Sequence, residues 1–284
     1  MPLNYERIMA YRPGPLDASY DETRCILYAL GIGIGMDPLD HEQIKFVHER
    51  ELKAFPTLAT VLGWMGRLTD PAFGIDARMV VAASLKVTLH RPLQVRDTLT
   101  SDPRIVEIID KGAGRHAIIQ SARTLSLADG TAVAIVESTS IARGHGGFGG
   151  KAVDSPEPHP VPEAPPDAAC DLPTPPNLAL IYRLLGDENP LHIDPTSAKS
   201  SGYARPILHG SATFGIAAHA ILRVTAGYDP TRLASIEARF SRPVFPGETI
   251  RTELWRDGGG EISFRCRVVE RDEIVLTNGL ARLR

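Results

Sequence analysis

The chain has 284 residues, of which 43% are apolar, so it can bury a substantial core and is long enough for one large domain or two ordinary ones. Its 31 basic and 34 acidic residues are interspersed, and the formal net charge is −3. No segment offers the positive stripe that a nucleic-acid backbone needs, so nucleic acid is excluded as an expected partner.

Cysteine usage and targeting signals bear on the cellular location. Cys25, Cys170 and Cys266 lie far apart, and none has a neighbouring Cys or His at ligand spacing, so neither a disulfide framework nor a zinc site is predicted. The stretch "MPLNYERIMAYRPGP" lacks a signal-peptide pattern, and the apolar stretch "CILYALGIGIGM" is short and rich in glycine. The final "ARLR" matches no peroxisomal or retention tail. We therefore expect no membrane span and a cytoplasmic location.

The first half of the chain predicts an apolar helix followed by strands. A glycine-containing apolar segment runs from 58 to 68 and is the helix candidate. Four segments that alternate apolar and polar residues follow at 82–93, 97–109, 114–127 and 130–143. A buried helix followed by an antiparallel meander predicts a sheet wrapped around one helix, which is an α+β arrangement.

A segment without helix or strand signals comes next. Residues 144–150, "GHGGFGG", lead into a proline-rich stretch at 151–176, where we expect neither helix nor sheet pairing. We interpret 151–176 as a linker between an N-terminal unit at 1–150 and a C-terminal unit at 177–284. The alternative is a long surface loop within one domain, although unstructured loops of this length are uncommon in compact domains.

The second half repeats the order of the first. The sequence "ILHGSATFGIAAHAILRVTAG" at 207–227 predicts a helix that is apolar nearly all round and therefore buried. Alternating segments at 235–244, 249–255, 261–270 and 273–284 predict four strands. The predicted fold class is α+β, with two antiparallel sheets each wrapped around a buried central helix.

Short matches between the halves indicate a duplicated unit. Pro56 aligns with Pro206 and Arg91 with Arg242, at offsets of 150 and 151 residues. Upstream of both matches, "YALG" in the first half corresponds to "YRLLG" in the second. Three matches in the same order favour a repeat of the whole fold unit.

The stretch "GDENPLHIDP" combines polar side chains with a proline. Because Pro190 disfavours helix at Asn189, we expect a loop that carries Asp187 and His192. A carboxylate and an imidazole in one pocket can hold a water and act as an acid/base pair. One alternative is that Asp187 caps the next turn while His192 packs locally. The other is a metal site made by Asp187, His192, Asp194 and His209.

The sequence "PILHGSATFG" places His209 and Gly210 at the start of the second predicted helix, where free N–H groups and the positive end of the helix dipole are available. Since Gly210 has no side chain, a carbonyl oxygen that gains negative charge could be held there. The alternative is that Gly210 only permits close packing. An acid/base pair together with an oxyanion site suits addition of water to an α,β-unsaturated thioester.

Residues 182–215, "YRLLGDENPLHIDPTSAKSSGYARPILHGSATFG", resemble the motif of the R-specific enoyl-CoA hydratases of the MaoC-like family, which have the hotdog fold. The two-unit length is similar to that of the double-hotdog subgroup. The resemblance implies that Asp187 and His192 position and activate water, that Asn189 orients their loop, and that the Gly210 N–H holds the thioester oxygen. It also implies an acyl-CoA substrate, no metal or organic cofactor, and a homodimer. Acyl carrier protein is the alternative carrier of the acyl group.

Further residues are expected to bind substrate. His209 lies beside the proposed oxyanion donor, and three basic residues are candidate contacts for the phosphates of coenzyme A: Lys199, Arg205 and Arg242. The alternative for the basic residues is that they are solvated surface groups.

The chain departs from the family pattern at several positions. Leu185 stands where the family often has a small hydroxyl residue, which would alter the shape of the pocket. The repeat alignment places Ile32 opposite Asp187 and Thr60 opposite Gly210, so the N-terminal unit has lost the acid/base pair. In double-hotdog hydratases such a unit is expected to make room for a bulky acyl chain. The sequence "GIGIG" then indicates a widened tunnel, or else tight helix packing.

Three functions compete at this point. The leading hypothesis is a lyase that adds water reversibly to a trans-2-enoyl thioester and gives the R-3-hydroxyacyl product. The second is an acyl-CoA thioesterase, because one fold hosts both reactions. The third is a non-catalytic subunit that binds acyl thioesters, which the intact motif argues against.

Overall fold

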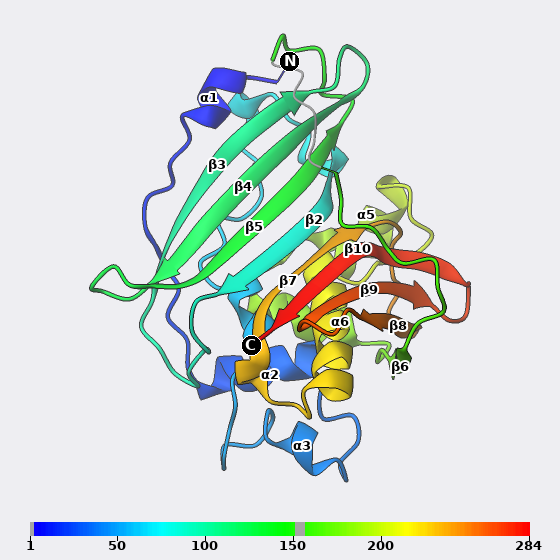
Figure 1. The fold of residues 1–284 in the computed structure, drawn as a ribbon. Coiled ribbons are helices and arrows are strands. Elements are labelled where there is room, and N and C mark those ends of the chain that lie inside the picture. The colour runs from blue at the N-terminus through cyan, green and yellow to red at the C-terminus, as the bar shows by residue number, and fades with distance from the viewer. Residues whose placement is uncertain (1–2, 151–156) are drawn as a thin grey trace.

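The computed structural model describes residues 3–150 and 157–284. Ten strands form one sheet in which neighbouring strands are antiparallel, in the order β1-β3-β4-β5-β2-β7-β10-β9-β8-β6 (Figure 1). The N-terminal half contributes β1 (Leu16–Asp17), β2 (Val80–Leu89), β3 (Thr100–Asp110), β4 (His116–Ser126) and β5 (Ala132–Arg143). The C-terminal half contributes β6 (Ala168–Pro173), β7 (Leu233–Phe240), β8 (Thr249–Arg256), β9 (Glu261–Val268) and β10 (Glu273–Leu283).

The prediction of eight strands at alternating segments is confirmed, but the prediction of two separate sheets is wrong. Strands β2 and β7 pair with each other, with Ser84 opposite Arg239 and Thr88 opposite Ser235. This pairing satisfies the N–H and C=O groups that two separate sheets would have left exposed at their edges. The two halves of the chain therefore share one sheet.

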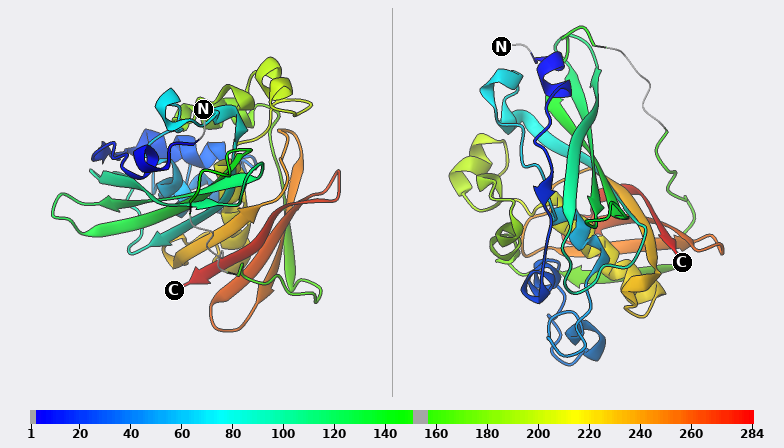
Figure 2. Two further views of the ribbon diagram at one scale, coloured as in Figure 1. Left: turned by 90° about the horizontal axis from the view of Figure 1, so that it is seen from above. Right: turned by 90° about the vertical axis from the view of Figure 1, so that its left-hand side faces the viewer.

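The buried helix predicted in the second half is confirmed as α6 (Gly210–Thr225). Every residue from Ala212 to Leu222 is buried, which explains why the segment is apolar nearly all round. Helix α6 contacts strands from both halves of the sheet, namely β2, β6, β7 and β8. Figure 2 shows most helical segments on one face of the curved sheet. The C-terminal half thus has a long helix enclosed by its strands.

The α-helix predicted from 58 to 68 is wrong, because only a short 3-10 helix, η1 (Pro56–Val61), forms there. Gly63 then turns the chain with a φ of 52°. The chain is already extended at Leu62, and a Cβ at Gly63 would lie 2.2 Å from the Cβ of Ser101 on β3, so only glycine lets the chain come this close to the sheet. Within residues 3–150, the segment predicted as the central helix of the N-terminal half therefore forms no long helix.

A buried arginine stabilises this short 3-10 helix. Arg123 on β4 donates from Nε to the carbonyl of Leu62 at 3.0 Å and from Nη2 to the carbonyls of Ala59 and Thr60. Burial lowers the pKa of Arg123 to about 10, so the guanidinium stays charged at neutral pH. Its donors replace the main-chain partners that a longer helix would have supplied.

The remaining helical segments are short. The α-helices are α1 (Tyr5–Met9), α2 (Glu22–Gly31), α3 (His41–Ile44), α4 (Leu178–Tyr182) and α5 (Pro195–Ser200). The further 3-10 helices are η2 (Pro71–Phe73), η3 (Ala77–Met79), η4 (Arg183–Leu185), η5 (Pro190–His192) and η6 (Pro230–Arg232). Helices α2 and α4, which carry the matching tyrosines of the repeat, contact each other. Their rings, Tyr28 and Tyr182, have centroids 6.1 Å apart.

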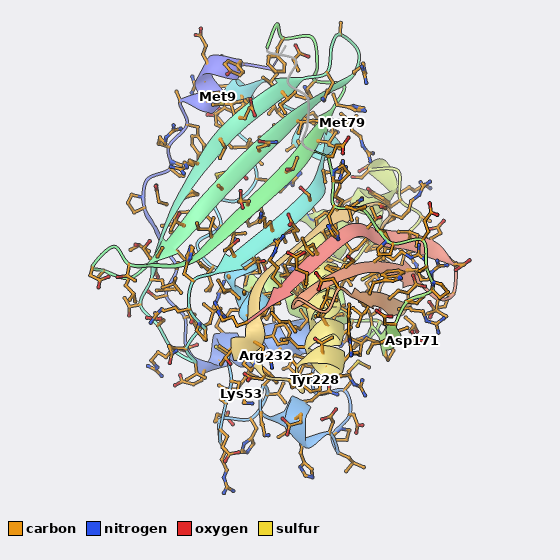
Figure 3. All side chains as sticks on the ribbon, viewed as in Figure 1. Met9, Lys53, Met79, Asp171, Tyr228 and Arg232 are labelled. Carbon is orange, nitrogen blue, oxygen red and sulfur yellow. The ribbon has the colours of Figure 1, made fainter. Side chains whose placement is uncertain are left out.

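The proline-rich stretch at 151–176 is partly structured. Residues 151–156 lie outside the described residues, but Ala168–Pro173 forms β6 and pairs with β8, so the prediction that this stretch has no sheet pairing is wrong. Pro173 is tolerated because β6 is an edge strand. Asp171 on β6, labelled in Figure 3, also forms an ion pair of 2.7 Å with Arg251 on β8. The boundaries of the two predicted units stay a prediction.

The glycine-rich segment at 144–150 is an anchored turn. The carboxylate of Asp110, at the end of β3, accepts hydrogen bonds from the N–H groups of Gly147, Gly149 and Gly150. These bonds lower the pKa of Asp110 below its usual value. A run of small residues is needed here because the main chain itself binds the carboxylate.

The cysteines and the helices bear on bonding and location. All three cysteines are buried and free in the structure. Within residues 3–150 and 157–284, no helix combines the length and the apolar character needed to cross a membrane.

Candidate active site

The loop that carries Asp187 is built from two 3-10 turns. The first turn, η4, ends at Gly186, whose φ of 115° favours glycine. The second turn, η5, begins after Asn189, whose Oδ1 accepts from the N–H of Leu191 at 3.2 Å. The Asp187 Oδ1 accepts from the N–H of Asn189 at 3.2 Å. The sequence around Pro190 therefore fixes the loop locally.

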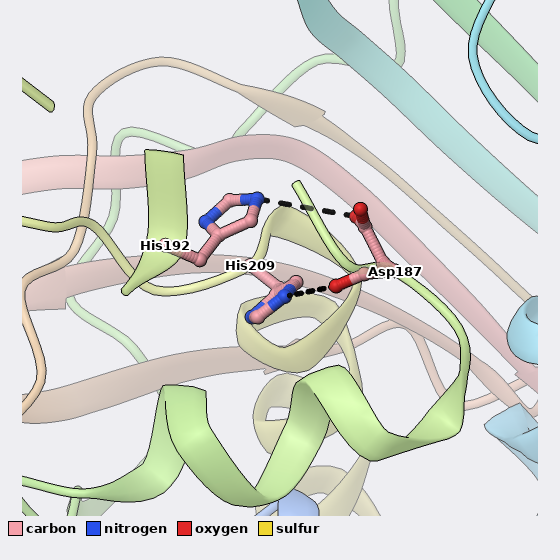
Figure 4. A group of neighbouring side chains, drawn as sticks. All are labelled: Asp187, His192 and His209. Atoms are coloured by element: carbon pink, nitrogen blue, oxygen red, sulfur yellow. Dashed lines mark hydrogen bonds and ion pairs between the residues drawn. The ribbon is translucent and has the colours of Figure 1, made fainter. Parts of the chain in front are cut away.

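The imidazole of His192 is oriented by a main-chain carbonyl. Its Nδ1 lies 2.9 Å from the oxygen of Ile207. Because a carbonyl only accepts hydrogen bonds, Nδ1 carries the proton, and the neutral ring presents the lone pair of Nε2. That Nε2 lies 3.9 Å from Oδ2 of Asp187 (Figure 4). Two hydrogen-bond acceptors thus face each other across a gap too long for a direct hydrogen bond.

Burial controls the charge of the His192 ring. His192 is 8% exposed, and its burial lowers its pKa below the usual value, while the nearby Asp187 carboxylate opposes the shift. The ring is therefore neutral at pH 7. The side chain of Asp187 is 27% exposed, so solvent or a ligand can reach the carboxylate.

A second histidine lies beneath the first. His209 is fully buried, and its ring stacks on that of His192 with centroids 3.7 Å apart and planes inclined by 25°. Its Nε2 donates to the main-chain oxygen of Asp187 at 3.1 Å (Figure 4). Burial lowers the pKa of His209 to about 3, with a further contribution from His192. The predicted substrate contact through this side chain does not fit its burial.

The metal site considered from the sequence is only partly assembled. Asp187, His192 and His209 each offer a ligand atom, and these atoms lie within 4.8 Å of one another. However, the nitrogen lone pairs of His192 and His209 lie in the planes of their rings, and these two planes are stacked. The lone pairs therefore do not point at one common metal ion unless one ring rotates. The fourth candidate, Asp194, instead caps α5 by accepting from Thr196 and Ser197. The geometry favours the acid/base alternative.

Gly210 is the first residue of α6, as predicted. The preceding residue, His209, makes no side-chain hydrogen bond to the first turn, so it leaves the N–H groups of that turn to other partners. The positive end of a 16-residue helix lies at this point. A Cβ at Gly210 would come within 3.2 Å of the Phe240 ring, so close packing also favours glycine here. Both interpretations of Gly210 are compatible with the structure.

The three basic residues expected to contact coenzyme A lie outside this centre. Lys199 is exposed on α5 and borders a surface hollow of about 570 Å³ together with Pro195, Thr196 and Ser200. The Arg205 guanidinium lies 4.8 Å from the centroid of the Phe245 ring. Arg242 is exposed just after β7. The phosphate contacts stay predictions.

The departures from the family pattern have structural explanations. The Leu185 side chain packs on Gly31, where a Cβ would lie 3.5 Å from Cδ1 of Leu185. It therefore fills the contact between α2 and η4. Gly33 and Gly35 have φ values of 77° and 88°, so they supply turns. The alternative of tight packing accounts for Gly31, and the predicted tunnel stays a prediction.

Sequence reasoning missed two buried hydroxyl groups beside this centre. Tyr182 lies next to His209, with ring centroids 5.0 Å apart, and its hydroxyl has no hydrogen-bond partner in the described part of the chain. The Tyr28 hydroxyl bonds to Oγ1 of Thr57 at 2.8 Å. Burial raises the pKa of both tyrosines. The repeat alignment had already matched Tyr28 with Tyr182, which was the available signal.

Comparisons with known proteins cover both halves. Residues 158–278 match the MaoC like domain, and residues 18–144 match the MFE-2 hydratase 2 N-terminal domain. The chain is 36% identical to 3-hydroxyacyl-thioester dehydratase Y from Mycobacterium tuberculosis, with 93% of each chain covered. It is 34% identical to peroxisomal enoyl-CoA hydratase 2 from Arabidopsis thaliana, covering 96% of this chain and 93% of the relative.

A solved structure shows the same fold. The crystal structure of a MaoC-like dehydratase from Phytophthora capsici superposes with a TM-score of 0.86 at 31% identity, covering 99% of this chain and 98% of the other. The mostly antiparallel sheet with its helices is therefore the hotdog architecture that the resemblance implied. The long match in sequence and in structure extends through the motif around Asp187 and His192.

Proposed function

Because the chain belongs to the MaoC-like dehydratase family, we propose that it adds water reversibly to trans-2-enoyl-CoA and gives (R)-3-hydroxyacyl-CoA. The relatives named above support both directions of this reaction, since one is named a hydratase and the other a dehydratase. The activity is that of a hydro-lyase in fatty acid metabolism.

One observation carries the proposal. The Nε2 of His192 and the Oδ2 of Asp187 are both acceptors and lie 3.9 Å apart. A water placed about 2.8 Å from each atom can donate one hydrogen bond to each. Its oxygen lone pairs then face away from both acceptors and toward a substrate. Such a site orients a nucleophilic water without help from a metal.

The reaction follows from this placement. The water oxygen forms a bond to C3 of the enoyl group, and the electrons of the C2–C3 double bond move toward the thioester carbonyl. The Gly210 N–H at the start of α6 stabilises the negative oxygen that forms. The Asp187 and His192 pair takes one proton from water and delivers one to C2, so the net change is addition of H and OH.

The other site residues have supporting roles in this proposal. Asn189 holds the loop through its cap of η5. Lys199, Arg205 and Arg242 contact the phosphates of coenzyme A, and the exposure of all three side chains supports this assignment. No metal or organic cofactor takes part, because the paired groups supply the proton transfers themselves.

The proposal extends to the molecule as a whole. The two units form a double hotdog in which the N-terminal unit has lost the catalytic pair and makes room for the acyl chain. We infer a homodimer from the family resemblance. Cysteine usage supports a cytoplasmic location, although the relative from Arabidopsis thaliana is named peroxisomal.

The assay uses purified protein with a short and a long trans-2-enoyl-CoA. Ultraviolet absorbance follows loss of the conjugated thioester, a thiol reagent detects free coenzyme A, and chiral analysis identifies the product. Loss of conjugation without free thiol, and with an R-configured product, is the expected result. Release of thiol would instead assign a thioesterase, and no change with either substrate would contradict the proposed hydratase.

A further inference from the structure

The buried His209 carries an inference about how the active site is held together. Sequence reasoning placed it among the substrate contacts, yet none of its surface is exposed. It immediately precedes Gly210 in the chain and contacts both members of the proposed catalytic pair. A side chain with these contacts acts on its neighbours and not on the substrate.

The first contact fixes the main chain at Asp187. The Nε2 of His209 lies 3.1 Å from the carbonyl oxygen of Asp187, and since a carbonyl only accepts, Nε2 carries the proton. With a pKa of about 3, the ring is neutral at physiological pH and keeps this single tautomer. The position of the Asp187 backbone therefore depends on the His209 ring.

The second contact fixes the plane of His192. Its ring face lies on the His209 ring at 3.7 Å, while its Nδ1 donates to the carbonyl of Ile207, two residues before His209. Residues 207–209 thus contact the face and the Nδ1 edge of the His192 ring, and they also contact the main-chain carbonyl of Asp187. The same segment continues into the first N–H of α6.

We propose that His209 is a positioning residue that sets the placement of Asp187 and His192 relative to each other and to the start of α6. The inference rests on the proposed function for its kinetic effects only. The spacing of the motif residues does not predict this role for the His209 ring. Removal of the ring is expected to misplace the pair by a fraction of an ångström to an ångström, which is enough to slow a reaction that depends on orientation.

The test compares three variants. His209→Ala removes the stack and the hydrogen bond, and His209→Phe keeps a stacked ring but removes the donor. His219→Ala is the matched control, because His219 is a buried histidine within α6, nine residues after Gly210, and its Nε2 bonds to the hydroxyl of Tyr228, which is labelled in Figure 3. Thermal unfolding and circular dichroism check the fold of each variant.

Kinetics with a short enoyl-CoA give the first readout. We expect His209→Ala to lower kcat on the order of 10- to 100-fold with KM within about twofold of wild type, because orientation is lost and binding is not. We expect a smaller loss for His209→Phe and unchanged kcat for His219→Ala. A raised KM with unchanged kcat in His209→Ala would establish the substrate contact instead.

Titration of His192 by proton NMR gives a readout that needs no substrate. Its signal is assigned among the nine histidines by its absence in His192→Gln. The charged or titratable groups near His192 are Asp187, His209 and Arg67. Water entering the space left in His209→Ala removes part of the desolvation, so the pKa of His192 should rise toward its usual value, whereas His209→Phe should leave it low.

The outcomes separate this inference from the proposed function. If the wild-type protein hydrates no enoyl-CoA, the proposed function fails, but the His192 titration still decides the positioning role. An unchanged His192 pKa together with unchanged kcat in His209→Ala would overturn the inference and leave His209 as a packing residue. If His209→Ala does not fold, wild-type kcat in His209→Phe would overturn it equally.

Discussion

The two halves of the molecule use corresponding segments to build different centres. In the C-terminal half, the segment after Pro206 becomes the 16-residue helix α6, and the residue before this helix, His209, contacts both members of the proposed catalytic pair. In the N-terminal half, the segment after Pro56 forms only the six-residue η1, held by the buried Arg123. A helix satisfies its own main chain, whereas the short turn depends on a distant side chain. The half that carries the proposed catalytic pair is thus the half whose central segment forms a long, internally hydrogen-bonded helix.

The halves also differ at the position where the repeat alignment places Ile32 opposite Asp187. Asp187 is partly exposed and faces His192, while Ile32 is fully buried. A Cβ on Gly215 of α6 would lie 2.5 Å from Cγ2 of Ile32, so the isoleucine fills space against the helix of the other half. We therefore expect the C-terminal half to supply the chemistry and the N-terminal half to support it, and the variants below test this division.

The largest effect is expected from the catalytic pair. Asp187→Asn and His192→Gln should each keep the fold and lower the hydration rate about 10²- to 10⁴-fold, because each removes a positioned acid or base. Steady-state kinetics on a short enoyl-CoA measures the loss. Glu188→Gln, a change at the neighbouring exposed carboxylate, is the control and should behave as wild type. Near-normal activity in either pair variant would contradict the assignment.

The next effect concerns the helix start. Gly210→Pro deletes one N–H donor and should lower kcat about 10²- to 10³-fold, as for other oxyanion donors. Gly210→Ala is the matched variant, because it adds a Cβ against Phe240 but keeps the donor. Proline is accepted at the first position of a helix, so both variants should fold. Equal losses in the two variants would favour close packing as the role of Gly210.

A loss of stability is expected from the N-terminal half. Arg123→Met leaves the carbonyls at the end of η1 without their donors and should lower the free energy of unfolding by about 3 kcal/mol, since each unsatisfied buried group costs roughly 1 to 3 kcal/mol. Urea denaturation measures this. Arg104→Met on the exposed side of β3 should change stability by less than about 0.5 kcal/mol. Equal effects would show that Arg123 does not support η1.

The smallest effect tests the matched position in the supporting half. Ile32→Val removes one methyl group beside Gly215 and should cost about 1 kcal/mol of stability. The Ile32→Val variant should alter the preference for long over short acyl chains, measured as the ratio of their kcat/KM values. Its effect on kcat with the short substrate should be smaller. Ile34→Val, at a buried neighbour, is the comparison. A uniform loss on all substrates would argue against a supporting role in acyl binding.

Part of the fold could be predicted because it depends on local patterns of apolar and polar residues. Alternation of apolar and polar residues marked the long strands, and the all-round apolar segment marked α6. The short strand β6 was missed because Pro173 and the prolines on either side of the strand hid the alternation of Cys170 and Leu172, which are buried. Arg123 could have been noticed, because the alternation of β4 places it among the side chains that face the core. An arginine in a strand is usually interpreted as a surface residue, however.

The residues of the candidate site were likewise predictable only in part. The sequence indicated Asp187, His192 and Gly210, because proline, glycine and the helix start constrain the chain locally. It could not show that His209 lies under His192, since the two residues are 17 positions apart and meet through packing. Nor could it show that Tyr182 lies beside them.

By itself the sequence determined the eight long strands, the buried helix α6 and the turn that carries Asp187 and His192, because periodicity and turn chemistry act over a few residues. Only the tertiary structure decided that β2 and β7 join the halves into one sheet, that Arg123 bonds to the carbonyls at the end of η1, and that His209 stacks on His192 and bonds to the carbonyl of Asp187. These contacts join distant segments, and their energies arise from burial and from satisfying polar groups away from water.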